Sequence, residues 1–321
     1  MVRAARDAVC SSQPHALSEA ARVAVAERFG VPSDEVVLGA GVSSLVWSVA
    51  KALVEPGSTW LSVEPSVTGF AAAARAAGAR VTQWRAVERR DHRIELDQVA
   101  ELARLVQPKV ISLSAPADPS GTSVAFASLC ALAEQLPDIH LVVDQSWLGL
   151  CSDHADLELL PPDNVLCLRS LSVELALTGL RAGYLLARSR LAERVQRAQP
   201  PMAASAPAAA ALAAAMHERA FLERCRSELL ADGQCLKQML RDLALTHSPS
   251  VTPFTLVRVA RAQEVADELL TTHQIAVYDA TRVGLPDHLR IAAPPPAALE
   301  QLKTALERVL ERRGLVRGRE A

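Results

Sequence analysis

The feature that most constrains the fold is a regular alternation of short apolar runs and amphipathic segments between Pro32 and Ala187. Runs such as HLVVD, which ends at Asp144, are apolar on both faces. Such strands are covered on both sides, and their alternation with helices is typical of a largely parallel sheet between two helical layers. The strands that we expect are Val36–Leu38, Trp60–Val63, Arg80–Gln83, Val110–Leu113, Leu141–Asp144, Val165–Leu168 and Gly183–Ala187.

Helical spacing of apolar residues appears between these runs. Leu45, Val49 and Leu53 mark one buried stripe, and a second is predicted over Val124, Ala127 and Cys130 or Ala131. The charged run RAVERRDHR (85–93) predicts a solvated loop.

A second, smaller unit is expected after the alternating region. A helical stretch from Ala206 to about Leu243 leads to further apolar runs, TPFTLVRV, QIAVYD and HLRIAA, with helices from Gln263 and Ala297. We therefore expect an N-terminal segment and helix over residues 1–30, a three-layer αβα large domain over residues 31–205, and a bridging helix with a small α+β domain over residues 206–321.

Composition excludes several classes of function. The 321 residues are half hydrophobic and carry a net charge of −2, which gives no general attraction to nucleic acid or to an anionic membrane. The longest apolar run, Ala203–Met216, is too short to span a bilayer, and the first residues lack the apolar core of a signal peptide. The six cysteines show neither CxxC pairing nor metal-ligand spacing. We expect a cytoplasmic protein with a small-molecule ligand and no metal.

The segment LGAGVSS (38–44) is a candidate anion site. A glycine-containing turn that leads into a helix presents backbone N–H groups and the positive end of the helix dipole to an anion. Gly41, Val42 and Ser43 occupy that position. For this motif taken alone, a purely structural turn is the better interpretation.

Further motifs change that interpretation. In chain order they are LGAGVSS (38–44), APADPSG (115–121), VVDQSW (142–147), RSLSVELALTGLRAGY (169–184) and LRIAAP (289–294). In this order and at this spacing, the chain resembles the fold-type-I pyridoxal-phosphate enzymes, and among them histidinol-phosphate aminotransferases and threonine-phosphate decarboxylases. The resemblance runs from about His15 to Leu310 and implies the fold expected above. It does not by itself imply a retained activity.

The resemblance also implies a ligand site. Ser170, Ser172 and Arg181 match the family's phosphate contacts, two hydroxyls and a guanidinium that can bind two oxygens. Asp144 matches the carboxylate that pairs with the protonated pyridine nitrogen, and Arg290 matches the arginine that binds the substrate carboxylate. The alternatives are a salt-bridged arginine for Arg181, a helix cap for Asp144 and a surface strand arginine for Arg290.

Several positions depart from the family pattern. Val173 stands where family members have the lysine that forms the Schiff base, and valine has neither a nucleophile nor a titratable proton. Val67 stands in place of a stacking aromatic ring, Asp118 in place of an asparagine, and Trp147 in place of a tyrosine. An ionised Asp118 would repel the cofactor's phenolic oxygen, which the asparagine hydrogen-bonds.

Other groups are poor substitutes for the lysine. The remaining lysines are Lys51, Lys109, Lys237 and Lys303. The first lies about 15 Å along its helix from the anion-binding end, the second precedes its strand, and the others lie outside the large domain. His154 and Cys151 are the nearest alternative base and nucleophile, although surface or packing roles are more typical of such residues.

Three functions remain open. The first is a repurposed enzyme that acts on a small carboxylate- or phosphate-bearing metabolite without an internal aldimine. Asp118, Asp144 and Trp147 would be its acid–base or orienting groups, and it would bind pyridoxamine phosphate or pyridoxal phosphate noncovalently or the metabolite directly.

The second is a noncatalytic subunit. The resemblance implies a dimer with sites at the interface, so the chain would form a homodimer or complete an active homologue in a heterodimer. The third is a conventional pyridoxal-phosphate aminotransferase. We favour the enzyme of the first hypothesis, because Arg181, Asp144 and Arg290 are retained together.

Overall fold

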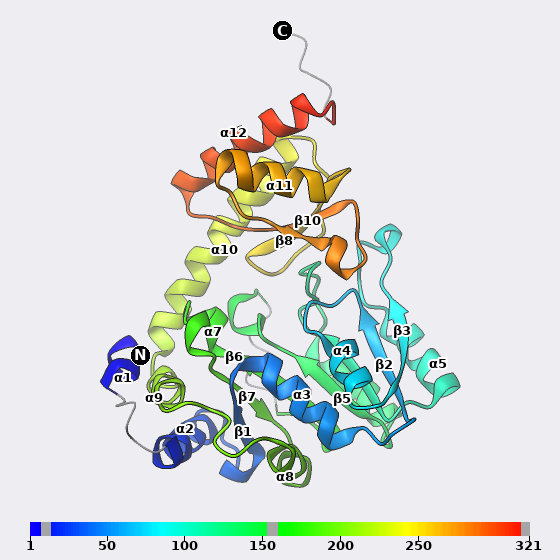
Figure 1. Cartoon of the computed structure of the whole chain (residues 1–321), viewed down its shortest axis with the longest axis vertical. Helices are drawn as coiled ribbons and strands as arrows, with labels where there is room; N and C mark the ends of the chain where they lie inside the picture. The colour runs from blue at the N-terminus through cyan, green and yellow to red at the C-terminus, as the bar shows by residue number, and fades with distance from the viewer. Residues whose placement is uncertain (8–13, 153–159, 316–321) are drawn as a thin grey trace.

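The computed structural model describes residues 1–7, 14–152 and 160–315. Two sheets organise these residues, a seven-stranded sheet surrounded by helices and a three-stranded sheet above it in Figure 1. Helix α10 (Arg219–Asp242) runs from the first to the second. We call the part built on the seven-stranded sheet the large lobe. The small lobe is the three-stranded sheet with helices α11 (Ala262–His273) and α12 (Pro296–Arg312).

The large sheet is the one that the alternating pattern predicts. Its strands lie in the order β1-β7-β6-β5-β4-β2-β3, and all are parallel except β7, which is antiparallel to both neighbours. Every expected strand is confirmed, with ends that differ by one or two residues. The strands are β1 (Val36–Gly39), β2 (Thr59–Glu64), β3 (Arg80–Arg85), β4 (Val110–Ser114), β5 (His140–Asp144), β6 (Val165–Ser170) and β7 (Gly183–Leu186).

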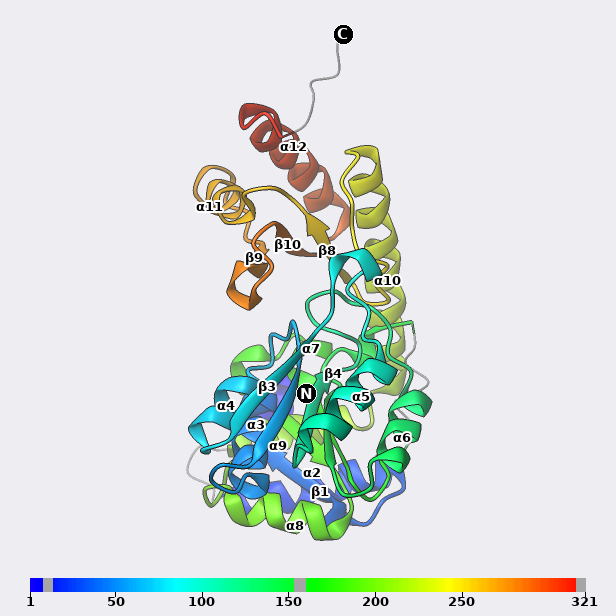
Figure 2. The same ribbon diagram turned by 90° about the vertical axis from the view of Figure 1, so that its right-hand side faces the viewer.

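Helices cover both faces of this sheet, as the doubly apolar strands require. Figure 2 shows α3 and α4 on one side of the strands and α5 and α6 on the other. Leu45, Val49 and Leu53 of α3 are buried in the first layer, which confirms the stripe predicted there. One layer contains α3 (Gly41–Leu53), α4 (Phe70–Ala76) and α8 (Ser189–Ala198), and the other contains α2 (Pro14–Phe29), α5 (Leu96–Val106), α6 (Phe126–Gln135) and α9 (Ala206–Ala215).

Helix α6 packs in a register that differs from the prediction. The predicted stripe is confirmed only in part: Val124, which precedes the helix, and Cys130 are partly buried against the core, whereas Ala127 and Ala131 are exposed. A bulky apolar residue at the first helical position turns inward, where its burial contributes most, and this sets the register of the helix. The residues that α6 buries are Phe126, Leu129, Leu132 and Ala133.

The bridging region is two helices, not the single one predicted from Ala206 to about Leu243. Helix α9 is almost entirely alanine, packs beside α1 (Val2–Asp7) and α2, and is buried in the large core. Helix α10 carries many charged residues and has an apolar stripe only along one side. A helix that is apolar all round stays inside, whereas an amphipathic one must leave the core, so the chain turns between them.

The small lobe has an antiparallel sheet in the order β8-β10-β9. Its strands are β8 (Phe254–Arg258), β9 (Tyr278–Asp279) and β10 (His288–Ala292), so β9 is shorter than the QIAVYD run predicted. Its core joins the end of α10, α11 and α12. Across the described parts of the chain, no helix is both long enough and apolar enough to cross a bilayer.

The charged run 85–93 is largely exposed, as predicted, but Ala86 and His92 are buried. Arg85 ends β3, and a short 3₁₀ turn, η2 (Glu88–Arg90), follows. His92 is buried against His288 of the small lobe, with ring centroids 5.1 Å apart. Charge density predicted exposure, but the small lobe covers the end of this run.

Candidate functional site

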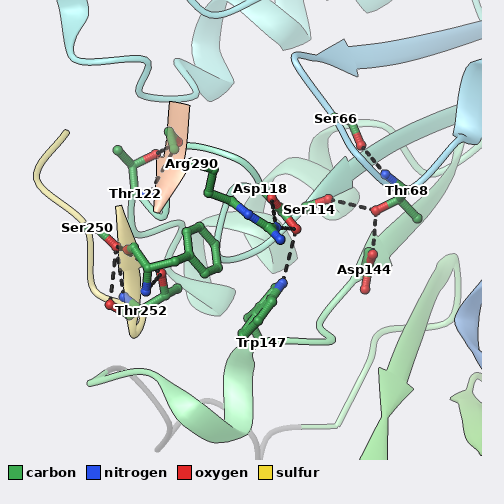
Figure 3. A network of polar contacts seen from close by, with 12 residues as sticks. Ser66, Thr68, Ser114, Asp118, Thr122, Asp144, Trp147, Ser250, Thr252 and Arg290 are labelled. Carbon is green, nitrogen blue, oxygen red and sulfur yellow. Dashed lines mark hydrogen bonds and ion pairs between the residues drawn. The ribbon is translucent and has the colours of Figure 1, made fainter. Parts of the chain in front are cut away.

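The predicted site residues gather along one edge of the large sheet. Strands β1, β4, β5 and β6 end there, and the antiparallel β7 begins there. Ligands of open α/β sheets bind at this edge. The small lobe lies over it, since Arg290 of β10 reaches Asp118 in the loop after β4 (Figure 3). The motifs in the sequence are therefore neighbours in space.

The first part of the site is the junction of α3 with β7. Gly41, the first residue of α3, has φ +77°, and a Cβ atom there would lie 2.5 Å from Arg181 Nη2. A Cβ on Gly183 would lie 3.0 Å from the Gly41 Cα. Arg181 is exposed, and its Nη1 donates a hydrogen bond of 3.2 Å to the Thr178 carbonyl. Glycine at these positions lets a guanidinium lie against the N–H end of a helix, which is an arrangement suited to an anion.

The other predicted anion contacts occupy two environments. Val42 is buried in the first turn of α3, and Ser43 beside it is exposed. Ser170 is buried at the end of β6, immediately before the short helix α7 (Leu171–Glu174). The Ser172 hydroxyl donates to the Ala182 carbonyl at 3.0 Å and accepts from the Ala182 N–H at 3.1 Å. Ser172 therefore fixes α7 to the residue that follows Arg181.

Asp144 is buried at the end of β5 and held by donors on two sides. It accepts hydrogen bonds from the Ser146 N–H at 2.9 Å, from the Ser146 hydroxyl at 2.5 Å, and from the Thr68 hydroxyl. The Thr68 Oγ1 also lies 3.2 Å from Ser114 Oγ. Burial raises the pKa of the Asp144 carboxyl, although these hydrogen bonds act in the opposite direction. A carboxylate so placed can hold a cationic N–H or accept its proton.

Asp118, Arg290 and Trp147 form one connected group (Figure 3). Arg290 Nη1 lies 2.7 and 2.8 Å from the two carboxylate oxygens of Asp118, and Trp147 Nε1 donates to Asp118 Oδ2 at 3.1 Å. The guanidinium carbon lies 5.6 Å from the Trp147 ring centroid, 4.8 Å from that of Phe254 and 5.1 Å from that of Tyr278. The structure thus brings together Asp118 and Trp147, which depart from the family pattern, and Arg290, which matches it.

The small lobe also fixes the loop that carries Asp118. The Val251 N–H donates to the Gly121 carbonyl at 2.8 Å, and the Ser248 hydroxyl donates to the Ser120 carbonyl at 2.5 Å. A Cβ on Gly121 would collide with Ser250, so the two segments are in direct contact. The position of Asp118 is therefore set from both lobes.

Glu174, the residue after Val173, lies in surroundings that raise its pKa. Val173 and Glu174 are half-buried in α7, and the Glu174 carboxylate lies so close to Gly149 that a Cβ would not fit there. Burial raises the pKa of Glu174 to about 7, although Arg169 and the more distant Arg226 act in the opposite direction. The Arg169 guanidinium is itself buried, and its Nε donates to Gln145 at 2.9 Å.

The remaining candidates lie apart from this edge or outside the description. Cys151 is buried, with Sγ 3.2 Å from the Leu148 carbonyl, which fits the packing role expected for it. His154 lies outside the described residues. Lys237 on α10 donates to the Ser250 carbonyl at 2.7 Å, and burial lowers its pKa. Within the described ranges, no three His, Cys, Asp or Glu side chains form a group that could hold a metal ion.

Sequence reasoning missed four residues of the site, namely Thr68, Ser146, Phe254 and Tyr278. Ser146 follows Asp144 by two residues, and an aspartate side chain often accepts a hydrogen bond from the backbone N–H two residues later. The sequence therefore contained a local indication of this contact. The others contact the site from distant parts of the chain. Aromatic residues make up only 3% of the sequence, and three of them surround one guanidinium, which composition alone does not reveal.

Comparison with known proteins identifies the family. The family model for aminotransferase class I and II matches residues 3–309. Histidinol-phosphate aminotransferase 2 of Ralstonia nicotianae is 30% identical over 306 residues, which cover 92% of this chain and 80% of the relative. The histidinol-phosphate aminotransferase of Symbiobacterium thermophilum is 31% identical over 316 residues, or 95% and 86% of the two chains. The chain belongs to the class I and II aminotransferase family.

Solved structures agree in fold. The histidinol-phosphate aminotransferase of Sinorhizobium meliloti in complex with pyridoxal-5'-phosphate has a TM-score of 0.88 at 22% identity, covering 97% of this chain and 86% of that chain. The L-threonine-O-3-phosphate decarboxylase of Porphyromonas gingivalis has a TM-score of 0.79 at 23% identity, covering 92% and 89%. The architecture is that of the fold-type-I pyridoxal-phosphate enzymes.

Proposed function

We propose that this chain is a repurposed aminotransferase-family enzyme that binds pyridoxamine phosphate or pyridoxal phosphate noncovalently and acts on a small phosphate- or carboxylate-bearing metabolite. The observation that carries the proposal is the junction of Gly41, Arg181 and Gly183. Two segments, one with Gly41 and one with Arg181 and Gly183, approach there more closely than a side chain on either glycine would allow. Such a junction is suited to a phosphate and has no evident role in the core.

The described residues fit the cofactor at two ends. The N–H groups of Gly41, Val42 and Ser43 and the guanidinium of Arg181 would hold its phosphate. The buried carboxylate of Asp144 would hold the protonated ring nitrogen, because the positive charge of that nitrogen favours the ionised carboxyl. When bound, the cofactor would act as an electron sink for carbanion chemistry.

The position of Val173 sets a limit on the chemistry. It lies in α7 between Ser172, which is hydrogen-bonded to Ala182, and Glu174, which packs against Gly149. Valine cannot form a bond with a carbonyl carbon or carry a proton between two atoms. We therefore propose binding without a covalent bond to the chain, with Asp144, Asp118 and Trp147 as the groups that orient the ligand or exchange a proton with it.

One observation favours an assembly, either a homodimer or a pair with an active homologue. A mainly apolar groove of about 830 Å³ lies between α3, α4 and residues 198–203, next to the turn that contains Ala40. Trp47 and Met202 line it with more than half of their surface exposed. Exposed apolar surface of this kind is typical of protein interfaces. As a noncatalytic subunit, the chain would use this groove to support a partner's site.

Native mass spectrometry of the purified chain with each cofactor tests the proposal. We expect a homodimer that retains one ligand per chain, and no covalent adduct after borohydride reduction. With pyridoxal phosphate, the variant Val173→Lys should give the reduced adduct, because the lysine amine can condense with the cofactor's aldehyde. With pyridoxamine phosphate, which has no aldehyde, it should give none. If neither cofactor is retained by the wild type, the cofactor proposal is wrong and a partner-dependent subunit becomes the better interpretation.

A further inference from the structure

The arginine expected to bind a ligand carboxylate already has a carboxylate partner. Asp118 and Arg290 come from different lobes, and Nη1 lies within 2.8 Å of both Asp118 oxygens. Asp118 is 8% exposed and the Arg290 side chain 19%, so the ion pair is largely shielded from water. Charge-assisted hydrogen bonds in such surroundings are strong.

Aromatic rings restrict the space around the same guanidinium. Tyr278 is the cross-strand partner of Arg290 on β9, and Phe254 and Trp147 lie within 5.6 Å of the guanidinium carbon. Arg290 contacts Asp118 through Nη1 alone, so a second carboxylate at this guanidinium would have to displace Asp118 or share the guanidinium with it. In either position the second carboxylate would meet the negative charge of Asp118.

We propose that Asp118 is a specificity-determining residue that occupies Arg290 as a built-in carboxylate. The site then disfavours a metabolite that carries a free carboxylate at this end and favours one that presents an amine or a neutral group there. This inference narrows the metabolite class of the proposed function and rests on that function only for the bound cofactor.

Two physical arguments support this selectivity. Asp118 is held in place by the loop contacts with the small lobe, so its effective concentration at Arg290 exceeds that of a free metabolite. Displacement would also leave Asp118 buried without its counter-charge, which is strongly unfavourable. The negative charge of Asp118 already contributes to the raised pKa of Asp144, so two carboxylates act at this edge. An ammonium group on the ligand would relieve that repulsion, whereas another carboxylate would add to it.

The ion pair also links the two lobes, and a control must separate that role from selectivity. Glu88 and Arg258 form another ion pair between the lobes, with Oε1 and Nε 3.2 Å apart, on the exposed surface. Glu88→Gln weakens the contact between the lobes without changing Arg290. If Asp118 were only a structural link, Glu88→Gln and Asp118→Asn would have the same effect on ligand binding.

The test is a titration of succinate, as a simple carboxylate probe, into the full chain saturated with pyridoxamine phosphate. We expect Asp118→Asn to bind succinate at least about tenfold more tightly than the wild type. Glu88→Gln should match the wild type, and Asp118→Asn combined with Arg290→Gln should lose the gain. Equal binding by the wild type and Asp118→Asn, or a gain that survives loss of Arg290, would overturn the inference.

Two further measurements keep the outcome interpretable. Pyridoxamine phosphate binding is measured separately for each variant. If no variant binds it but Asp118→Asn still gains succinate affinity, the proposed function is wrong and the selectivity stands. Should Asp118→Asn fail to fold, Trp147→Phe removes one donor to Asp118 and is expected to raise succinate affinity a few-fold. In that case, no gain in Trp147→Phe overturns the inference.

Discussion

The guanidinium of Arg181 lies against the backbone of Gly41, so that a Cβ atom on Gly41 would be 2.5 Å from Nη2. These residues belong to segments about 140 positions apart, and they meet because β1 and β7 are adjacent in the sheet. The contact places a fixed positive charge beside the N–H end of α3. It is the most direct structural reason to expect a phosphate at this edge.

Gly41→Ala should therefore weaken cofactor binding. The new methyl group would displace Arg181 from the helix end, and we expect pyridoxamine phosphate affinity to fall at least about tenfold in equilibrium dialysis. Gly57→Ala is the matched control, because Gly57 also has a positive φ, +82°, and a Cβ there meets no atom within 4 Å. Both variants carry backbone strain of about 1 kcal/mol. A similar loss of binding in both would show that strain, and not the displaced arginine, is the cause.

Ser172→Ala tests the two hydrogen bonds that fix α7 to Ala182, the residue before β7. The change removes a donor and an acceptor and leaves the buried Ala182 N–H without this partner. We expect the free energy of unfolding to fall by about 1–3 kcal/mol in urea titrations. Ser227→Ala removes an exposed side-chain bond within α10 and should cost less than about 0.5 kcal/mol. Equal losses in the two variants would contradict the role assigned to Ser172.

Much of the fold could be predicted because its signals are local. Doubly apolar strands such as β5 identify a covered parallel sheet, and the glycine turn into α3 becomes a candidate anion site once the other motifs are taken with it. The order of the motifs then places Asp144 and Arg181 at one edge of that sheet.

The rest depends on contacts between distant segments. The alternating pattern does not indicate that Asp118 pairs with Arg290, because the two residues are separated by 172 positions and come from different lobes. His92 was predicted to be solvated from its charged neighbours, and only the packing of the small lobe explains its burial. The stripe predicted for α6 is likewise right only in part, since burial of Phe126 turns Ala127 and Ala131 outward while Cys130 stays partly buried.

Glu174 should make the chain less stable as pH rises. Burial raises its pKa in the folded chain to about 7 from a usual value of 4.5, so between these values the folded state holds a proton that the unfolded state has lost. The free energy of unfolding then falls as pH rises through this window. We expect Glu174→Gln to be more stable than the wild type at pH 8 by on the order of 1–2 kcal/mol, with no difference near pH 4.

Urea titrations at several pH values measure this difference. Glu228→Gln, an exposed carboxyl on α10, is the control and should follow the wild type at each pH. If Glu174→Gln were less stable than the wild type at pH 8, attraction to Arg169 and Arg226 would outweigh burial, and the assigned direction would be wrong.

The His92–His288 contact should weaken the chain in acid. Burial lowers the pKa of both imidazoles below 6.5, and His288 lowers that of His92 further. Arg258 also lowers the pKa of His288. Nearby carboxylates act in the opposite direction: Glu88 raises both pKa values, Asp91 raises that of His92, and Asp287 raises that of His288. Below pH 6.5 the unfolded chain binds protons before the folded one does, so stability present above 6.5 is lost as pH falls toward the folded values.

His288→Gln should flatten this dependence. The change removes one imidazole and also removes the charge that lowers the pKa of His92. The difference in unfolding free energy between pH 7 and pH 5 should therefore shrink by on the order of 1 kcal/mol. His217→Gln, an exposed histidine before α10, should keep the wild-type slope. Because the two rings join the lobes, the protection of β10 amides against hydrogen exchange, relative to the intrinsic rate at each pH, should also fall below pH 6 in the wild type. Because Glu174 acts in the opposite direction over this range, the Glu174→Gln protein is the background for this measurement. If its stability did not change between pH 7 and pH 5, the buried pair would not titrate in this range.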